Sequence, residues 1–213
     1  MVDTTMQANP DDLVAVWIHR SDGYEIPWGD WRKSVFYHYG YIPYTMIDAT
    51  IQSSSGMFQA HIDQRLAVPT DVTLNLGASE IDASSVLVSV EICVEATGAA
   101  TAMNLHVLDV LDFTPTSPTW YRNCVRQGFQ LGTVVVAPGT CIGVDQPIVF
   151  GSDSLARPAD IRIAAFVEAP LDIGPGEAYQ AAMVAWPLPP TDHPVYANGS
   201  ESGAPDGWSL VVP

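Results

Sequence analysis

Residues 85–94 read SVLVSVEICV, and this stretch indicates the fold class of the chain. Its even positions carry only valine and isoleucine, whereas its odd positions are mixed. Successive side chains of a β-strand point to opposite faces of the sheet, so the stretch predicts a strand with one face in a core and one face nearer water. We expect the first set to be buried and Ser89 and Glu91 to be less so; the buried set is Val86, Val88, Val90 and Ile92.

Short strand-like stretches follow one another along the chain from residue 71, with turn residues between them. They lie at residues 71–76, 85–95, 104–111, 132–137, 147–150, 160–168 and 177–184. Several short strands at this spacing favour a mainly antiparallel β-sandwich, which we place at residues 69–186.

Two segments depart from that pattern. Residues 117–129 predict a short helix, because Ser117 can cap it and Pro118 suits its first position. The tail at residues 187–213 is rich in Pro, Gly, Ser and Asp, which predicts irregular structure wrapping the surface or a neighbour.

The N-terminal part, residues 11–68, has a different texture. Residues 13–19, LVAVWIH, form a near-continuous apolar run, which is typical of a strand buried on both faces. Residues 31–39 and 56–67 carry apolar side chains four positions apart and predict helices, with a short strand at residues 44–49 between them. The sequence therefore predicts an α+β fold in which a small α/β layer precedes the β-sandwich.

The charge balance restricts the partners. The chain of 213 residues has 24 acidic and 8 basic side chains, a net charge of −16. Nucleic acids and anionic membrane surfaces bind through Lys and Arg, so this balance argues against both. No apolar run reaches the roughly 18 residues of a membrane-spanning helix. The first ten residues lack the pattern of a secretory signal, so either the protein is not exported or a signal has been removed.

The segment GYIPYTMIDA at residues 40–49 follows a predicted strand and helix and precedes another helix. This order resembles the second half of a thioredoxin fold. Ile42 and Pro43 stand where that family has an aliphatic residue and a cis-proline, although Tyr44 intervenes before Thr45. The resemblance implies a cis Ile42–Pro43 peptide bond.

Later segments extend the resemblance: NLHVLDV at 104–110, RQGF at 126–129, AAFVE at 164–168 and AYQAA at 178–182. They resemble the all-β domain that follows the thioredoxin domain in certain secreted bacterial thioredoxin-like outer-membrane lipoproteins. This likeness implies a periplasmic or secreted location. The half that carries C-x-x-C in that family is missing here, so Pro43 is the one family residue near the redox groove with a counterpart.

The missing half leaves a sheet edge and a helix face uncovered, and an uncovered edge is a template for strand pairing. Aromatic side chains are dense between residues 17 and 44. We therefore expect a protein partner or a second copy to cover this region; the interface candidates are Trp28, Trp31, Tyr39, Tyr41, Pro43 and Tyr44. The alternatives are a local aromatic core and a monomer closed by the sandwich and the tail.

Three cysteines are present and none forms a C-x-x-C pair. Cys124 and Cys141 both lie near predicted turns, which makes them the favoured disulfide; three buried thiols remain an alternative. Arg122 and Arg126 flank Cys124, which suits a reactive thiol only if a base is nearby.

Methionine and histidine recur at short spacing at two places, where thioether and imidazole ligands would suit copper. The residues are Met57 with His61, and Met103 with His106. The alternative is that these residues fill the core or lie on the surface.

Two functions remain open from the sequence. The first is a non-catalytic extracytoplasmic binding or assembly subunit without a cofactor. The second is an oxidoreductase that uses either copper held by Met and His or the thiol of Cys124.

Overall fold

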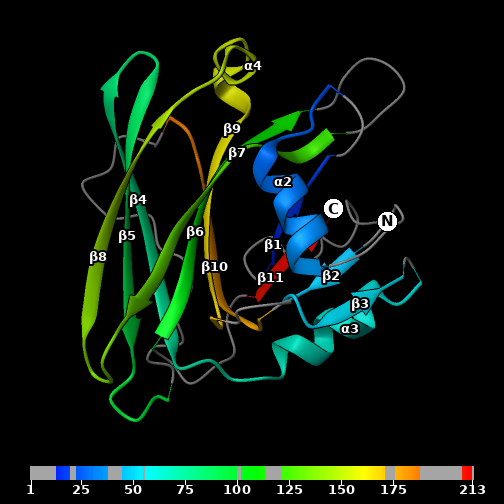
Figure 1. Cartoon of the computed structure of the whole chain (residues 1–213), viewed down its shortest axis with the longest axis vertical. Helices are drawn as coiled ribbons and strands as arrows, with labels where there is room; N and C mark the ends of the chain where they lie inside the picture. Colours follow the sequence, from blue (N-terminus) through cyan, green and yellow to red (C-terminus); the bar gives the residue numbers. More distant parts are fainter. Residues whose placement is uncertain are drawn as a thin grey trace.

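The computed structural model describes residues 13–19, 23–37, 45–54, 56–99, 102–113, 121–170, 176–187 and 208–212. Strands dominate these residues and helices are short, in agreement with a mixed α+β fold (Figure 1). The strands are β1 (Leu13–Trp17), β2 (Thr45–Ile47), β3 (Ile51–Ser53), β4 (Val72–Asp82), β5 (Ser85–Val94), β6 (Ala102–Phe113), β7 (Tyr121–Val135), β8 (Cys141–Val149), β9 (Ile161–Glu168), β10 (Ala178–Ala185) and β11 (Trp208–Val212). The helical segments are α2 (Pro27–Trp31) with its π-helical continuation η1 (Arg32–Tyr37), α3 (Phe58–Leu66), α4 (Ser152–Leu155) and the 3-10 turn η2 (Pro158–Asp160).

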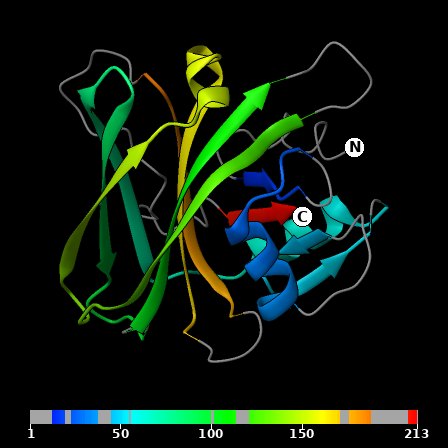
Figure 2. The same cartoon turned by 45° about the horizontal axis from the view of Figure 1, so that its top comes forward.

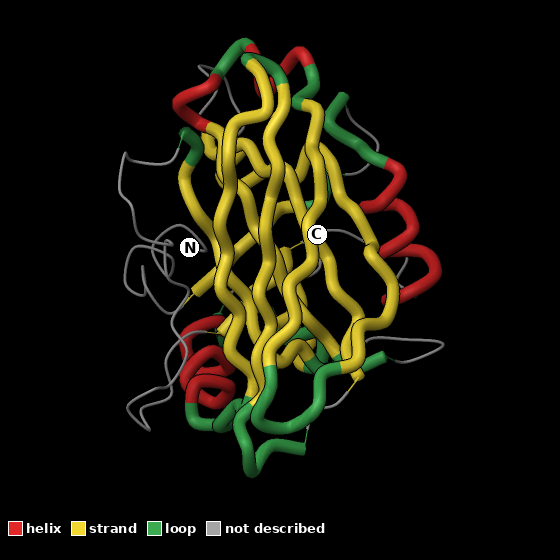
Figure 3. Tube along the Cα trace, turned by 90° about the vertical axis from the view of Figure 1, so that its left-hand side faces the viewer, coloured by secondary structure: helices red, strands yellow, loops and turns green. Residues whose placement is uncertain are grey.

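Two sheets pack face to face in the larger part of the molecule (Figures 1 and 3). One has the order β4-β5-β8, and the other begins β10-β9-β6-β7. The even positions of β5 point into the core between them and are at most 3% exposed, whereas Ser89 and Glu91 are exposed. The alternating pattern of residues 85–94 is thereby confirmed as a strand with one buried face.

The second sheet does not stop at β7 but continues into the N-terminal layer as β1-β11-β2-β3, giving eight strands in all (Figure 2). β1 runs parallel to both β7 and β11, while β11 and β2 are antiparallel, as are β2 and β3. The predicted segments at residues 11–68 and 69–186 thus contribute strands to one continuous sheet.

Helices cover two regions of the eight-stranded sheet. α3 packs Phe58 and Ile62 against Leu13, Ala15 and Ile47. α2 and the residue before it place Ile26 and Trp28 on the face of β6, β7 and β9 that is turned away from the sandwich core; the strand residues there include Leu108, Val110, Val125 and Phe166. The eight-stranded sheet therefore has apolar cover on both faces where β6, β7 and β9 run together.

Three sequence-based predictions need correction. The helix expected at residues 117–129 is wrong for residues 121–129, which belong to the long strand β7 paired antiparallel with β6. The capping signal at Ser117 is local, whereas residues 121–129 pair with β6 over their length. Such long-range strand pairing regularly overrides a weak local propensity for helix. The tail is not irregular throughout, since residues 208–212 form β11. The first helix begins at Pro27 instead of residue 31, with proline at the first helical position.

Among the described residues, no helix combines the length and the apolar character needed to cross a bilayer.

Candidate functional site

A group of charged and aromatic side chains lies where α2 and η1 meet the eight-stranded sheet. Arg32 Nη1 donates to Glu168 Oε1 at 2.6 Å and Nη2 donates to Oε2 at 2.5 Å, which is a bidentate ion pair. His106 Nε2 lies 3.0 Å from the same Oε1. All three side chains are 0% exposed. The three residues come from η1, β9 and β6, so the group exists only in the folded chain.

Trp28 sets the proton arrangement of this group. Its indole Nε1 donates to His106 Nδ1 at 3.4 Å. An indole nitrogen can only donate, so Nδ1 must accept and the imidazole proton sits on Nε2, where it is donated to Glu168. His106 is thus a neutral bridge between an aromatic donor and a carboxylate.

Aromatic rings enclose the charges. The His106 ring stacks on Phe166 with centroids 4.6 Å apart and on Trp31 with centroids 6.2 Å apart. The Arg32 guanidinium carbon lies 5.2 Å from the centroid of Phe166 and 5.8 Å from that of Trp28, distances at which a cation is attracted to an aromatic face. These rings exclude solvent from the ion pair. The low dielectric constant of such surroundings strengthens the attraction between Arg32 and Glu168.

The pKa values follow from this enclosure. Burial lowers the pKa of His106 and the charge of Arg32 lowers it further, while the bond to Glu168 acts in the opposite direction. Burial alone would raise the pKa of Glu168, but the hydrogen bonds and charge of Arg32, aided by His106, hold it below its usual range. The stable state is therefore a neutral histidine beside an ionised carboxylate.

A second buried carboxylate lies elsewhere on β6. Asp109 is 0% exposed, and its Oδ2 accepts from Ser154 Oγ at 3.0 Å and from Gln127 Nε2 at 3.3 Å. Its Oδ1 is buried without a hydrogen-bond partner among the described residues. Burial raises the pKa of Asp109 to about 6, although these hydrogen bonds and the charge of Arg126 oppose the rise.

A third charged group ties α3 to the sheet. Arg65 Nε donates to Asp48 Oδ2 at 2.9 Å, and its Nη2 donates to Glu177. Asp48 has a positive φ of 47° in the turn between β2 and β3, a conformation that Asp tolerates better than most residues. This group fastens the N-terminal layer to the segment that enters β10.

Two of the expected interface residues are described. Trp28 is 7% exposed and packs against the chain's own sheet, whereas Trp31 is half-buried beside His106. The other four, which are Tyr39, Tyr41, Pro43 and Tyr44, lie outside the described residues, as does the predicted cis Ile42–Pro43 bond. The cis bond that the structure does describe joins Trp186 to Pro187.

The residues considered for copper lie in two separate places. Met57 is 46% exposed just before α3, and His61 Nδ1 lies 2.8 Å from Ser53 Oγ. Met103 is fully buried in the sandwich core, while His106 has both ring nitrogens engaged with Trp28 and Glu168. Met103 and His106 therefore lie on opposite faces of β6, one in the sandwich core and the other beside Trp28 and Glu168.

The predicted disulfide between Cys124 and Cys141 is wrong. Cys141 is bonded to Cys93, its direct neighbour across the β5–β8 ladder. Cys124 is fully buried on β7 next to β1, in the other sheet. Cys141 follows a Pro-Gly-Thr turn in the sequence, but it is the first residue of β8, whose pairing with β5 sets it opposite Cys93.

Neither Arg32 nor Glu168 was predicted from the sequence as a site residue, and Asp109 was not predicted to be buried. A usable signal existed for Glu168 and Asp109, because each stands in a mainly apolar stretch, IRIAAFVE and LHVLDVL respectively. Carboxylates are seldom fully buried unless they are paired. Their partners could not be read from the sequence, because Arg32 lies 136 positions from Glu168.

No protein-family model matches this chain, and no curated protein matches it. Solved structures do resemble it. It is similar to HBP35 of Porphyromonas gingivalis, with a TM-score of 0.50 and 12% identity over 67% of this chain and 50% of that one. The chain thus spans half the length of that protein. It is also similar to a structural-genomics protein from Agrobacterium tumefaciens, with a TM-score of 0.53 and 11% identity over 81% of this chain and 76% of that one.

A domain of the outer membrane lipoprotein Omp28 from Porphyromonas gingivalis aligns with 16% identity and a TM-score of 0.30 over 54% of this chain and 87% of that one. At such identities the comparisons concern fold alone. By fold, this chain is similar to HBP35 and to the Agrobacterium protein.

Proposed function

We propose that this chain is a non-catalytic, extracytoplasmic binding or assembly subunit, in which a thioredoxin-like half-layer is joined to a β-sandwich. The observation that carries the proposal is the position of β11 in the sheet. This strand comes from the far end of the chain and lies in the middle of the N-terminal layer, between β1 and β2. It occupies the place that was expected for a protein partner or a second copy, in the way that the alternative, closure of the layer by the chain's own tail, requires.

β11 is paired on both sides. It runs parallel to β1 from Leu13↔Trp208 to Trp17↔Val212, and it is antiparallel to β2 at Leu210↔Ile47 and Val211↔Met46. Without it, β1 and β2 would each expose a row of unpaired backbone groups, which is the condition for accepting a strand from elsewhere. The half-layer is therefore built around a slot for one strand.

The same slot suits β11 of a second copy. An exchanged strand would make the same ladder contacts, which is why exchange of identical elements is a low-cost route to dimers. Residues 186–207 separate β10 from β11, a stretch of 22 positions that spans at most about 75 Å when extended. This length gives the strand reach beyond its own sheet.

Two further observations support the proposal. A disulfide that is partly exposed to solvent, Cys93–Cys141, persists best in an oxidising compartment outside the cytoplasm. The net charge of −16 favours a partner whose contacting face is basic or neutral.

The geometry does not favour the alternative enzyme. The thiol of Cys124 is fully buried, and the imidazole of His106 already serves Trp28 and Glu168. Either group would have to leave its present contacts before it met a substrate or a copper ion.

The test combines light scattering with strand exchange. Two differently tagged copies of the full chain are unfolded together in urea, refolded and examined for mixed species. We expect a dimer that contains both tags, and we expect Leu210→Pro to abolish it, because Leu210 pairs with both Ala15 and Ile47.

The matched control is Val135→Pro at the exposed end of β7, which weakens another strand but leaves the slot intact. A monomeric mass at every concentration, without mixed species after refolding, would contradict assembly by strand exchange.

A further inference from the structure

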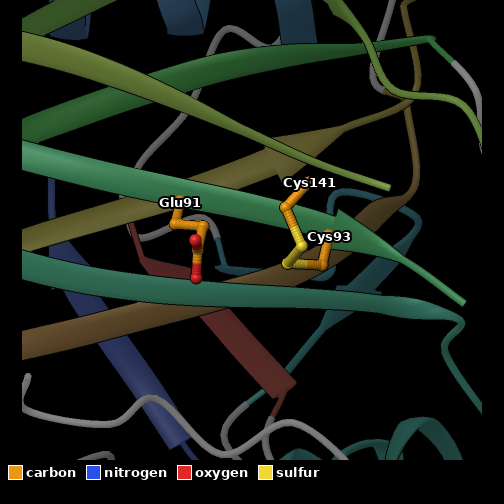
Figure 4. Close-up of side chains that lie close together, drawn as sticks. All are labelled: Glu91, Cys93 and Cys141. Carbon is orange, nitrogen blue, oxygen red and sulfur yellow. A yellow bond between two sulfur atoms is a disulfide. The ribbon is translucent and has the colours of Figure 1, made fainter. Parts of the chain in front are cut away.

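A compact group of potential metal ligands lies on the outer face of the three-stranded sheet. Cys93 on β5 and Cys141 on β8 are direct neighbours, and Glu91 lies two residues before Cys93 on the same face (Figure 4). One ligand atom from each of the three residues falls within 4.8 Å of the others. Glu91 and Cys141 are exposed and Cys93 is half-buried, so solvent ions reach the group.

We propose that Cys93, Cys141 and Glu91 form a redox-gated site for a thiophilic divalent cation such as Zn²⁺ or Cd²⁺. The proposal does not depend on the function proposed above. In the oxidised protein the two sulfurs are joined to each other and carry no charge, so they are poor ligands. In the reduced protein they become two thiol ligands beside a carboxylate.

The chemistry balances as follows. A dithiol or phosphine reductant supplies two electrons and cleaves the Cys93–Cys141 bond. A dithiol becomes a disulfide and passes its two protons to the cysteines. A phosphine becomes the phosphine oxide by taking the oxygen of a water molecule, whose two protons pass to the cysteines. A divalent cation then displaces both thiol protons and binds two thiolates and the Glu91 carboxylate. Water completes four ligands, a coordination number that zinc prefers.

The backbone is already suited to this arrangement. Thiolates bind zinc at about 2.3 Å, so the sulfurs of a tetrahedral site lie roughly 3.8 Å apart. Neighbouring residues of adjacent strands need only side-chain rotation to reach that separation, because the β5–β8 ladder fixes their backbones from Ser85↔Val149 to Cys93↔Cys141.

The carboxylate is held in place as well. Asn75 Nδ2 on β4 donates to Glu91 Oε2 at 2.9 Å. Carboxylates that bind metals are commonly oriented by such a hydrogen bond from a neighbouring residue. Three strands therefore contribute to the site, two with ligands and one with the residue that orients Glu91.

The bound cation would replace the disulfide as a link between β5 and β8. Cys93 and Cys141 are 48 positions apart and enclose the β6–β7 hairpin. Either the disulfide or the cation closes this loop, so the sheet keeps a bridge in both redox states.

The test uses the full chain, reduced with a phosphine and titrated with Cd²⁺. We expect the ultraviolet charge-transfer absorbance of thiolate bound to Cd²⁺ to saturate at one equivalent. The oxidised protein should show none of this absorbance. Glu91→Gln, which keeps both cysteines, should lower the affinity by more than about tenfold.

Glu80→Gln removes an exposed carboxylate elsewhere on the same sheet and should bind as the unchanged chain does. Cys124→Ser should retain the absorbance, since Cys124 lies in the other sheet. The proposal is overturned if the reduced chain gives no such absorbance, if Glu91→Gln binds as tightly as Glu80→Gln, or if the reduced chain loses its far-ultraviolet circular dichroism at saturating Cd²⁺.

Discussion

Arg32 and Glu168 form a bidentate ion pair across 136 positions of sequence, with both side chains fully buried. The pair joins η1 to β9, an inner strand of the eight-stranded sheet that lies between β10 and β6. Solvent does not reach this ion pair. Its role is therefore structural: it holds η1 against β9.

Breaking this ion pair should destabilise the protein severely. Arg32→Met leaves the Glu168 carboxylate buried without its main partner, and such losses cost about 3 to 5 kcal/mol. Urea unfolding followed by tryptophan emission measures the change. The matched control is Arg157→Met, which removes the partly exposed pair with Asp160 at 3.9 Å, and exposed pairs contribute only about 0 to 1 kcal/mol. Equal losses in the free energy of unfolding for the two variants would show that the buried pair does not stabilise the fold more than an exposed pair does.

Gly128→Ala, on β7, should displace Trp28 and so disturb the group formed by Arg32, His106 and Glu168. A Cβ at this position would overlap the indole of Trp28, which donates to His106. Overpacking of this kind costs about 1 to 3 kcal/mol, and the tryptophan emission of the folded protein should shift as the indole moves. Gly77→Ala is the control, since the nearest atom to its new Cβ is 3.9 Å away. An unshifted emission spectrum for Gly128→Ala would place Trp28 elsewhere.

Asp109 should make stability depend on pH. The pKa of its carboxyl rises from 3.8 to about 6 on folding, so between these values the folded state binds more protons than the unfolded state. The contribution of Asp109 to stability therefore falls as pH rises through this window. Asp109→Asn should gain about 2 to 3 kcal/mol more in the free energy of unfolding at pH 7.5 than at pH 4.

Chemical unfolding at the two pH values measures that difference. Asp63→Asn, which removes an exposed carboxylate on α3, is the control. A gain for Asp109→Asn that is the same at both pH values would mean that the carboxyl titrates normally in the folded protein.

Removing the disulfide should lower stability through the unfolded state. The loop between Cys93 and Cys141 spans 48 positions, and closing a loop of this length stabilises a protein by about 4 kcal/mol in the chain-entropy model. Unfolding of the double variant Cys93→Ser, Cys141→Ser in urea measures the loss. The control is the unchanged chain with its disulfide intact. An unaltered urea midpoint in the double variant would show that the disulfide does not stabilise the fold.

Placing a charge in the sandwich core should be more damaging still. Val90 is 1% exposed on the buried face of β5, and Val90→Asp would bury an unpaired carboxylate. We expect loss of the folded state, seen as the absence of a cooperative thermal transition. Ser89→Asp, one residue away on the exposed face, should retain that transition; equal behaviour of the two variants would reverse the assignment of faces.

Local pattern was sufficient for much of the sandwich. The valine and isoleucine positions of residues 85–94 marked the buried face of β5, and strands expected at residues 160–168 and 177–184 correspond to β9 and β10. These strands could be predicted because a period of two is a property of neighbouring residues and survives wherever the strand is placed.

The sequence by itself thus determined the strand-rich composition of the fold, the faces of its central strands and its acidic charge. Tertiary structure decided the rest, because it depends on which distant segments meet. Residues 121–129 became strand through pairing with β6, the C-terminal residues became β11 through pairing with β1 and β2, and Cys141 found Cys93 through the β5–β8 ladder. Likewise, Arg32 and Glu168 are ordinary surface-type residues until η1 and β9 bury them together, and only then does one charge stabilise the other.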